Sequence, residues 1–234
     1  MVETFPGFPP ELFKFLKSLK DNNNREWFND NKPQYKEYVV EPVCDFIFAM
    51  SPRLEKISRY YVADSRAHGG SMFRIYRDTR FSRDKKPYKE HVGCQFRHVA
   101  GKDVHAPGFY LHIEPGNIRI GGGIWRPPNP VLNQIRTRIV EKPDEWKAII
   151  NNTTFKKRFD SVDGDQLRRP PNGFSKDAPH MKDLKRKSYF VMQKHEDETL
   201  LQPGILSEVE RVFKAVSPLM AFLTTAIELP YKQR

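Results

Sequence analysis

The chain has 234 residues, of which 38% are hydrophobic and 12% aromatic, and its 40 Lys and Arg outnumber 29 Asp and Glu to give a formal net charge of +11. This length suffices for one sizeable core, so we expect a single domain over residues 1–234. No apolar run approaches the ~20 residues that cross a bilayer, and residues 1–10 lack the pattern of a signal peptide. These features predict a cytoplasmic protein without a membrane partner.

Helices are predicted over residues 9–60. Pro9 and Pro10 precede apolar residues at i, i+3, i+4 and i+7, a spacing typical of an amphipathic helix with proline in its first turn. A short helix over 25–31 follows Asn24, a favourable N-cap residue, and a third pattern covers residues 32–52. Because Pro42 does not fit the middle of an undisturbed helix, we expect a kink or a restart there.

The pattern changes from helical to alternating after residue 70. It predicts strands at residues 71–77, 90–98, 108–114 and 117–123, and the tight-turn signal Pro115-Gly116 implies antiparallel pairing of the last two. Helices return over 129–228, at 130–140, 143–151, 153–159 and 203–227, with a Pro- and Gly-rich loop at 164–180. The order predicts an α+β fold in which a central, mostly antiparallel sheet of four or more strands (residues 70–124) is packed by N-terminal and C-terminal helices.

The most distinctive motif is FRIYRDTRFSRDKKPYKEH, at residues 73–91. Aromatic and other apolar residues are interleaved with its charges, which favours a segment held in packed structure over a solvated charge run. Its cationic side chains are Arg74, Arg77, Arg80, Arg83, Lys85, Lys86 and Lys89. Fixed arginines and lysines suit phosphate or carboxylate groups, so the motif predicts an anion-binding site.

This motif resembles the signature of a family of uncharacterised proteins, mostly bacterial with fungal relatives, catalogued as domain of unknown function 2461. The resemblance covers most of the chain, from the aromatic start of the N-terminal helix to the region of Gly173, Asp177, Pro179, Leu184 and Lys185. The family has no established activity. The resemblance therefore implies relatives and leaves the function open.

Alternation along the predicted strands separates two faces of the sheet. One face takes Val92, Cys94 and Phe96 and should pack on helices. The other collects His91, Gln95, Tyr110, His112 and Arg119, with either Arg74 and Tyr76 or Arg77. This second face is either open to water, as in many antiparallel sheets, or forms a polar cleft with cationic walls.

The sequence leaves open whether the protein is an enzyme. In one hypothesis the cleft binds a small phosphorylated or carboxylated ligand, and His91 or His112 transfers a proton. Arg74, Arg77, Arg80 and Lys85 would hold the anion, while Asp78 would orient the arginines. The full predicted binding set is Arg74, Arg77, Asp78, Arg80, Lys85, Tyr88, Lys89 and Arg119.

Two other interpretations of the motif remain. It could bind the phosphate backbone of a nucleic acid, with Tyr76, Phe81 or Tyr88 stacking on bases, or form a structural network of ion pairs. We favour a small anionic ligand over nucleic acid, because the motif is compact and punctuated by acids. The sequence identifies no protein partner.

No cofactor is indicated. The chain lacks the glycine patterns of a Walker A loop and of a dinucleotide fingerprint, and the triplet at residues 121–123 suits a bend or a close backbone approach. Its seven histidines form no HxH or HExxH motif, so we predict no metal site. Cys44 and Cys94 form no CxxC pair and are predicted to be free thiols.

Overall fold

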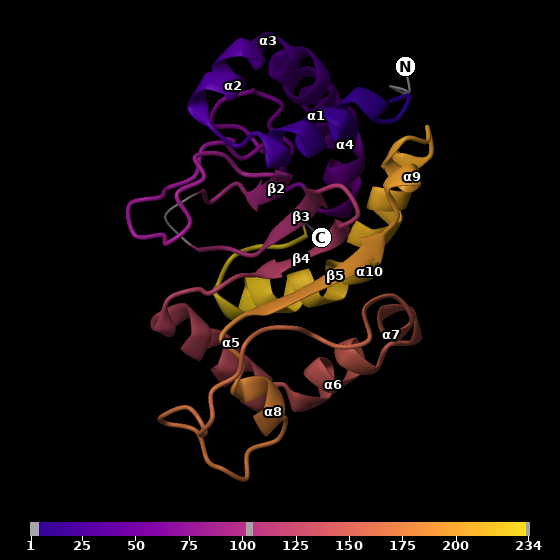
Figure 1. Ribbon diagram of the computed structural model, residues 1–234. Coiled ribbons are helices and arrows are strands. Elements are labelled where there is room, and N and C mark those ends of the chain that lie inside the picture. Colours follow the sequence, from indigo (N-terminus) through magenta and orange to yellow (C-terminus); the bar gives the residue numbers. More distant parts are fainter. Residues whose placement is uncertain (1–4, 102–104, 233–234) are drawn as a thin grey trace.

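A central antiparallel sheet organises the computed structural model, which describes residues 5–101 and 105–232. Its strands in this part of the chain are β1 Tyr61–Val62, β2 Val92–His98, β3 Gly108–Ile113, β4 Ile118–Ile124 and β5 Tyr189–His195. Neighbours pair in the order β1-β2-β3-β4-β5 (Figure 1). The predicted α+β fold with a mostly antiparallel sheet is confirmed. The expectation of one domain over residues 1–234 stays a prediction.

The N-terminal helices lie beyond the β1 edge of the sheet (Figure 1). They are α1 Pro10–Asp21, α2 Arg25–Asp30, α3 Lys32–Tyr35, the π-helical η1 Lys36–Val40 and α4 Glu41–Ile57. The Asn24 side chain caps α2 by accepting a hydrogen bond from the backbone N–H of Trp27. Pro42 lies in the first turn of α4, where a missing N–H leaves no helical hydrogen bond unmade. The helix thus restarts at this proline, after a π-helical segment.

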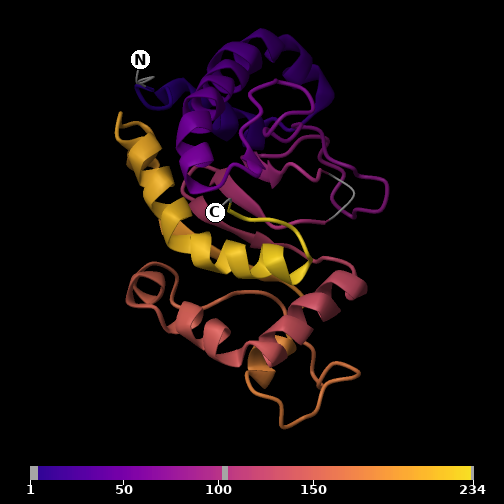
Figure 2. The ribbon, with the colours of Figure 1, turned by 180° about the vertical axis from the view of Figure 1, so that it is seen from behind.

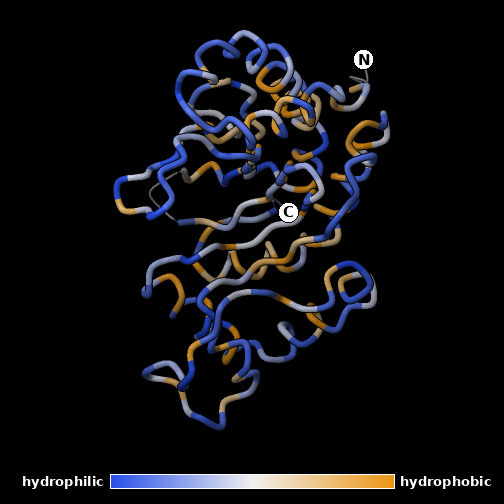
Figure 3. Tube along the Cα trace, in the orientation of Figure 1, coloured by the Kyte–Doolittle hydropathy of each residue, from blue (hydrophilic) through white to orange (hydrophobic). Residues whose placement is uncertain are grey.

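The C-terminal helices cover one face of the sheet and the region beyond β5. They are α5 Asn129–Glu141, α6 Pro143–Asn151, α7 Thr153–Phe159, α8 Met181–Leu184, α9 Asp197–Leu200 and α10 Ile205–Ala226. Helix α10 crosses the back of the sheet (Figure 2), where the Phe213 ring lies 4.7 Å from that of Phe109 and 5.5 Å from that of Phe96. Apolar residues gather between α10 and the sheet, while the outer loops are largely hydrophilic (Figure 3).

The strand predicted at residues 71–77 is wrong. This segment is extended but makes only isolated bridges, Met72 with Cys94 and Tyr76 with Tyr88. It follows β2 for two backbone hydrogen bonds and then turns away, so that the Lys89 N–H bonds to the carbonyl of Ile75. Physically, the chain folds back on itself here instead of continuing along the edge of β2.

Strand β5 lies inside the region predicted to be helical, residues 129–228, and is therefore a second correction. Its buried residues Tyr189 and Val191 alternate with half-buried Phe190 and Met192. The strand is held by its pairing with β4, from Ile118 opposite His195 to Ile124 opposite Tyr189. Residues 164–180 contain no helix, in agreement with the predicted loop.

Two smaller observations complete the fold. Cys44 and Cys94 are free thiols, as predicted, and Cys94 is buried. Among the helices of residues 5–101 and 105–232, none combines the length and the apolar character that a membrane span requires.

Candidate functional site

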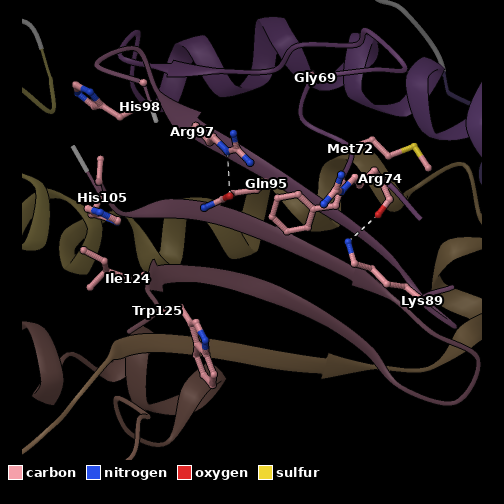
Figure 4. A pocket seen from close by; sticks show the side chains of 15 residues that line it. Gly69, Met72, Arg74, Lys89, Gln95, Arg97, His98, His105, Ile124 and Trp125 are labelled. Atoms are coloured by element: carbon pink, nitrogen blue, oxygen red, sulfur yellow. Dashed lines mark hydrogen bonds between the residues drawn. The ribbon is translucent and has the colours of Figure 1, made fainter. Parts of the chain in front are cut away.

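The face of the sheet opposite α10 carries two adjoining hollows. Their volumes are about 590 Å³ and about 770 Å³, and both are lined by Phe73, Gln95, Gly123 and Trp125. Loops form much of their walls, whereas the strands form the floor. We call the first, lined also by Arg74, Lys89 and Arg97, the cationic hollow (Figure 4), and the second, lined also by His91, His112 and Glu114, the histidine hollow.

Paired residues on adjacent strands form rows across this face. The first row is Arg97, Gly108, Gly123 and Phe190. The second row is Gln95, Tyr110, Gly121 and Met192, and the third is Gly93, His112, Arg119 and Lys194. Both central positions of the first row are glycines, and the flexible Gln95 amide lies over Gly108, 2.9 Å from where a β-carbon would be. A side chain at Gly123, where φ is +143°, would overlap the Tyr189 carbonyl oxygen, so the close approach of β5 requires glycine at this position.

Two cations lie against Phe73 in the cationic hollow, which Arg74 also lines. The ammonium group of Lys89 and the guanidinium carbon of Arg97 lie 5.5 and 5.6 Å from the centre of the Phe73 ring. Lys89 Nζ donates a hydrogen bond to the Arg74 carbonyl at 2.6 Å, and Arg97 Nε donates one to Gln95 Oε1 at 3.0 Å (Figure 4).

The positive charge of this hollow is not balanced locally. No aspartate or glutamate is found among its lining residues in the described part of the chain. Burial, together with the nearby charge of Arg74, lowers the pKa of Lys89. An anion placed in this hollow would meet cations without competing carboxylates, and this arrangement is suited to phosphate or carboxylate recognition.

The histidine hollow contains a chain of polar contacts. His112 Nε2 lies 3.2 Å from Glu114 Oε2, and Tyr110 Oη lies 3.4 Å from His112 Nδ1. When Nε2–H donates to the carboxylate, neutral His112 presents Nδ1 as an acceptor for the Tyr110 hydroxyl. Although burial opposes the change, hydrogen bonds from Asn117 and His112 lower the pKa of Glu114. The carboxylate therefore stays ionised and orients the imidazole of His112.

His91 completes this hollow. Its ring lies against that of His112, and burial followed by the influence of His112 lowers the pKa of His91 to about 4. His91 is therefore a neutral imidazole near pH 7. A neutral imidazole beside a second imidazole that a carboxylate orients is suited to proton transfer with a molecule bound beside them.

A family model described as "Conserved hypothetical protein (DUF2461)" matches residues 11–222. The chain belongs to this family. The resemblance seen in the motif is thereby confirmed, and the match to DUF2461 spans all of the strands and both hollows. Neither the curated proteins nor the solved structures contain a match to the chain.

Part of the sequence motif of this DUF2461 member lies outside both hollows. Arg77 pairs with Asp84 at 2.6 Å, and Arg80 pairs with Asp78 at 2.7 Å. The side chains of both aspartates are about half exposed. Lys85 donates instead to the backbone carbonyl of Thr79 at 3.0 Å. The structure describes all four cations that were predicted to hold the anion. Of these four, Arg74 alone lines a hollow.

Four further residues of the predicted site have clear positions. Lys89 lines the cationic hollow, and Arg119 lines the histidine hollow with its Nε donating to Asn117 Oδ1 at 2.8 Å. Asp78 belongs to the exposed loop as the partner of Arg80. Tyr88 is buried and stacks on Phe28 with ring centroids 4.1 Å apart, so it packs against the N-terminal helices.

Sequence reasoning missed Arg97, Trp125 and Phe190 as site residues. Arg97 lies two residues after Gln95 on β2 and therefore shares its face, so this position was readable from the sequence. Phe190 lies on the strand that was predicted as helix, and Trp125 lies in the loop after β4. The aromatic contact between them, 5.1 Å between ring centroids, depends on β4–β5 pairing.

Proposed function

We propose that this protein binds a small phosphorylated or carboxylated ligand on the open face of its sheet. Arg74, Lys89 and Arg97 hold the anionic group. The observation that carries the proposal is the lining of the cationic hollow, about 590 Å³, by these three cations without a carboxylate among its described lining residues. The volume lies within the range of small-molecule sites, roughly 300 to 1,000 Å³.

Proton transfer is the chemistry that the adjoining histidine hollow would add. The two hollows share Phe73, Gln95, Gly123 and Trp125. A ligand whose anionic group is bound in the cationic hollow can therefore extend into the histidine hollow. In this proposal the Tyr110 hydroxyl takes the proton of the ligand and passes its own to His112 Nδ1, while Glu114 holds the imidazole in place. His91 is the neighbouring neutral acceptor.

The alternatives fit the charge arrangement less well. A nucleic-acid surface needs cations that are free to replace counterions along a backbone, whereas Arg77, Arg80 and Lys86 are each paired with an acid. A network of ion pairs that holds the motif in place would need buried partners, yet the Arg80 side chain is 77% exposed. Such exposed pairs contribute little to stability, because water screens them.

Ligand-induced thermal stabilisation tests the proposal. The parent chain is screened against inorganic phosphate, pyrophosphate, sugar phosphates and dicarboxylates, and dissociation constants of the hits are measured by calorimetry. We expect at least one hit, weakened about tenfold or more by Lys89→Gln and by Arg97→Gln, because each removes a charge-assisted contact. Arg80→Gln is the matched control outside the hollow and should bind like the parent. A screen without hits, or equal binding by all variants, would overturn the proposal.

A further inference from the structure

The first row of the open face has chemically different ends. Arg97 on β2 is the cationic end, and Phe190 on β5 is the apolar end, with Gly108 and Gly123 between them. Three strand spacings separate β2 from β5, which amounts to about 14 Å. An isolated phosphate at Arg97 therefore leaves the far end of the row unused.

The apolar end is a prepared aromatic surface. Trp125 is 64% exposed, although it is a large hydrophobic residue, and its ring lies against Phe190 at an interplanar angle of 57°. The Arg126 guanidinium lies 5.6 Å from the indole centre and also pairs with Asp165 at 2.8 Å. An exposed indole lining a hollow is suited to stacking on a flat ring.

The two glycines of the row, with the Gln95 amide beside them, connect these two ends. Trp125 and Gly123 line both hollows, so the aromatic surface borders the same space as the three cations. A ligand that contacts both ends must carry an anion at one end and a planar apolar group at the other. It must also be slim enough in between to lie on the floor of Gly108 and Gly123.

We propose that the ligand is a phosphate ester with a planar aromatic group, of the nucleoside 5′-phosphate class. Its phosphate binds Arg74, Lys89 and Arg97, its sugar lies between the two ends of the row beside the Gln95 amide, and its base stacks on Trp125. This inference rests on the proposed function and names the ligand class of the same site.

Calorimetry with two probes that share a phosphate tests the inference. Adenosine 5′-monophosphate carries the base, whereas ribose 5-phosphate lacks it. We expect the nucleotide to bind the parent chain about tenfold or more tightly than the sugar phosphate, because stacking on an aromatic side chain supplies about that factor. Trp125→Ala should abolish this difference by weakening the nucleotide to about the affinity of ribose 5-phosphate.

Two further variants test where the ligand lies. Gly108→Val places a branched side chain on the floor, where a β-carbon would lie 2.9 Å from the flexible Gln95 amide. It should weaken binding of the nucleotide about tenfold or more, and its melting temperature shows that it folds. Phe81→Ala is the control, because Phe81 is the more exposed aromatic, at 96%, and lies outside both hollows. It should bind both probes like the parent.

The outcomes separate this inference from the proposed function. Equal affinity of the parent for the two probes overturns the aromatic ligand class but leaves an anion site in place. Tighter nucleotide binding that survives Trp125→Ala, or that is lost in Phe81→Ala, overturns the inference by placing the base elsewhere. If neither probe nor any anion of the screen binds, both proposals fail.

Discussion

The imidazole rings of His91 and His112 lie 4.4 Å apart between centroids, with their planes at 34°. His91 directly precedes β2 and His112 lies on β3, so antiparallel pairing of these strands brings the rings together. Burial and the influence of His112 lower the pKa of His91 from its ordinary 6.5 to about 4. A proton added to this pair therefore has a measurable effect on folding.

Acid should destabilise the fold through His91 in a defined pH window. Between pH 6.5 and about 4, the unfolded chain binds a proton at this residue that the folded chain does not, so the free energy of unfolding falls as pH falls. Above pH 6.5 both states are neutral there and the contribution is flat. His195, whose pKa is lowered by burial, adds a loss of the same sign. Urea unfolding of His91→Gln should show a shallower decline than the parent in this window.

The matched control for this prediction is His68→Gln, at an exposed position outside both hollows. Its unfolding free energy should follow the pH dependence of the parent. If His91→Gln also follows the parent across the window, His91 is protonated in the folded protein and the prediction is wrong.

The buried ion pair near α8 should be costly to break. Asp183 Oδ1 accepts from Arg186 Nε at 3.0 Å and Asp183 Oδ2 accepts from Trp146 Nε1 at 2.9 Å, and the side chains of the pair are only 12% and 6% exposed. Asp183→Ala leaves the guanidinium buried without its carboxylate and should cost about 3 to 5 kcal/mol. Asp78→Ala breaks an exposed pair and should cost far less than Asp183→Ala in the same urea titration. Similar costs for both would contradict this assignment.

Even a methyl group at position Gly93 should destabilise the fold. A β-carbon there would lie 2.5 Å from Tyr110 Oη and 3.0 Å from the Phe73 ring. Gly93→Ala should therefore lose about 1 to 3 kcal/mol of unfolding free energy through overpacking. Removing the hydroxyl with Tyr110→Phe relieves the closest contact, so the double variant should be more stable than the sum of the single losses. Strict additivity in this double-mutant cycle would rule out that contact as the cause.

A buried hydroxyl pair should respond asymmetrically to substitution. Thr224 Oγ1 donates to the Met220 carbonyl at 2.6 Å, so the Tyr61 hydroxyl, 2.7 Å away, is the donor of their shared hydrogen bond. Thr224→Val strands the buried Tyr61 hydroxyl and should cost about 1 to 3 kcal/mol. Tyr61→Phe leaves Thr224 with its carbonyl partner and should cost less. Chemical denaturation of both variants measures the loss of unfolding free energy. A larger loss in Tyr61→Phe than in Thr224→Val would reverse the donor assignment.

The helices were predictable because their signals are local. The expected ranges 143–151 and 153–159 coincide with α6 and α7, which begin with Pro143 in a first turn and with Asn152 capping Thr154 and Phe155 N–H groups. The strands depend on distant partners. Residues 71–77 have strand-like alternation but leave β2 early, whereas Tyr189–His195 becomes a strand through its contact with β4.

The candidate site was predictable where alternation alone decides the face. His91, His112 and Arg119 were placed on one face, and the structure brings them to one hollow. Charge density was a poorer guide, because Arg77 and Arg80 have acids nearby in the chain that neutralise them locally. The unbalanced charge at Arg74, Lys89 and Arg97 becomes visible only after folding sets which acids are out of reach.

The position of α10 in the chain has a consequence for synthesis on the ribosome. Domains generally begin to fold as their N-terminal parts emerge, but here the apolar back of the sheet is covered by Ile205–Ala226 and the free edge of β4 by Tyr189–His195. A nascent chain that ends before these segments therefore presents an unpaired strand edge and the rings of Phe96 and Phe109 to its surroundings. Premature termination in this region yields a product for chaperones and proteases instead of a partly working protein.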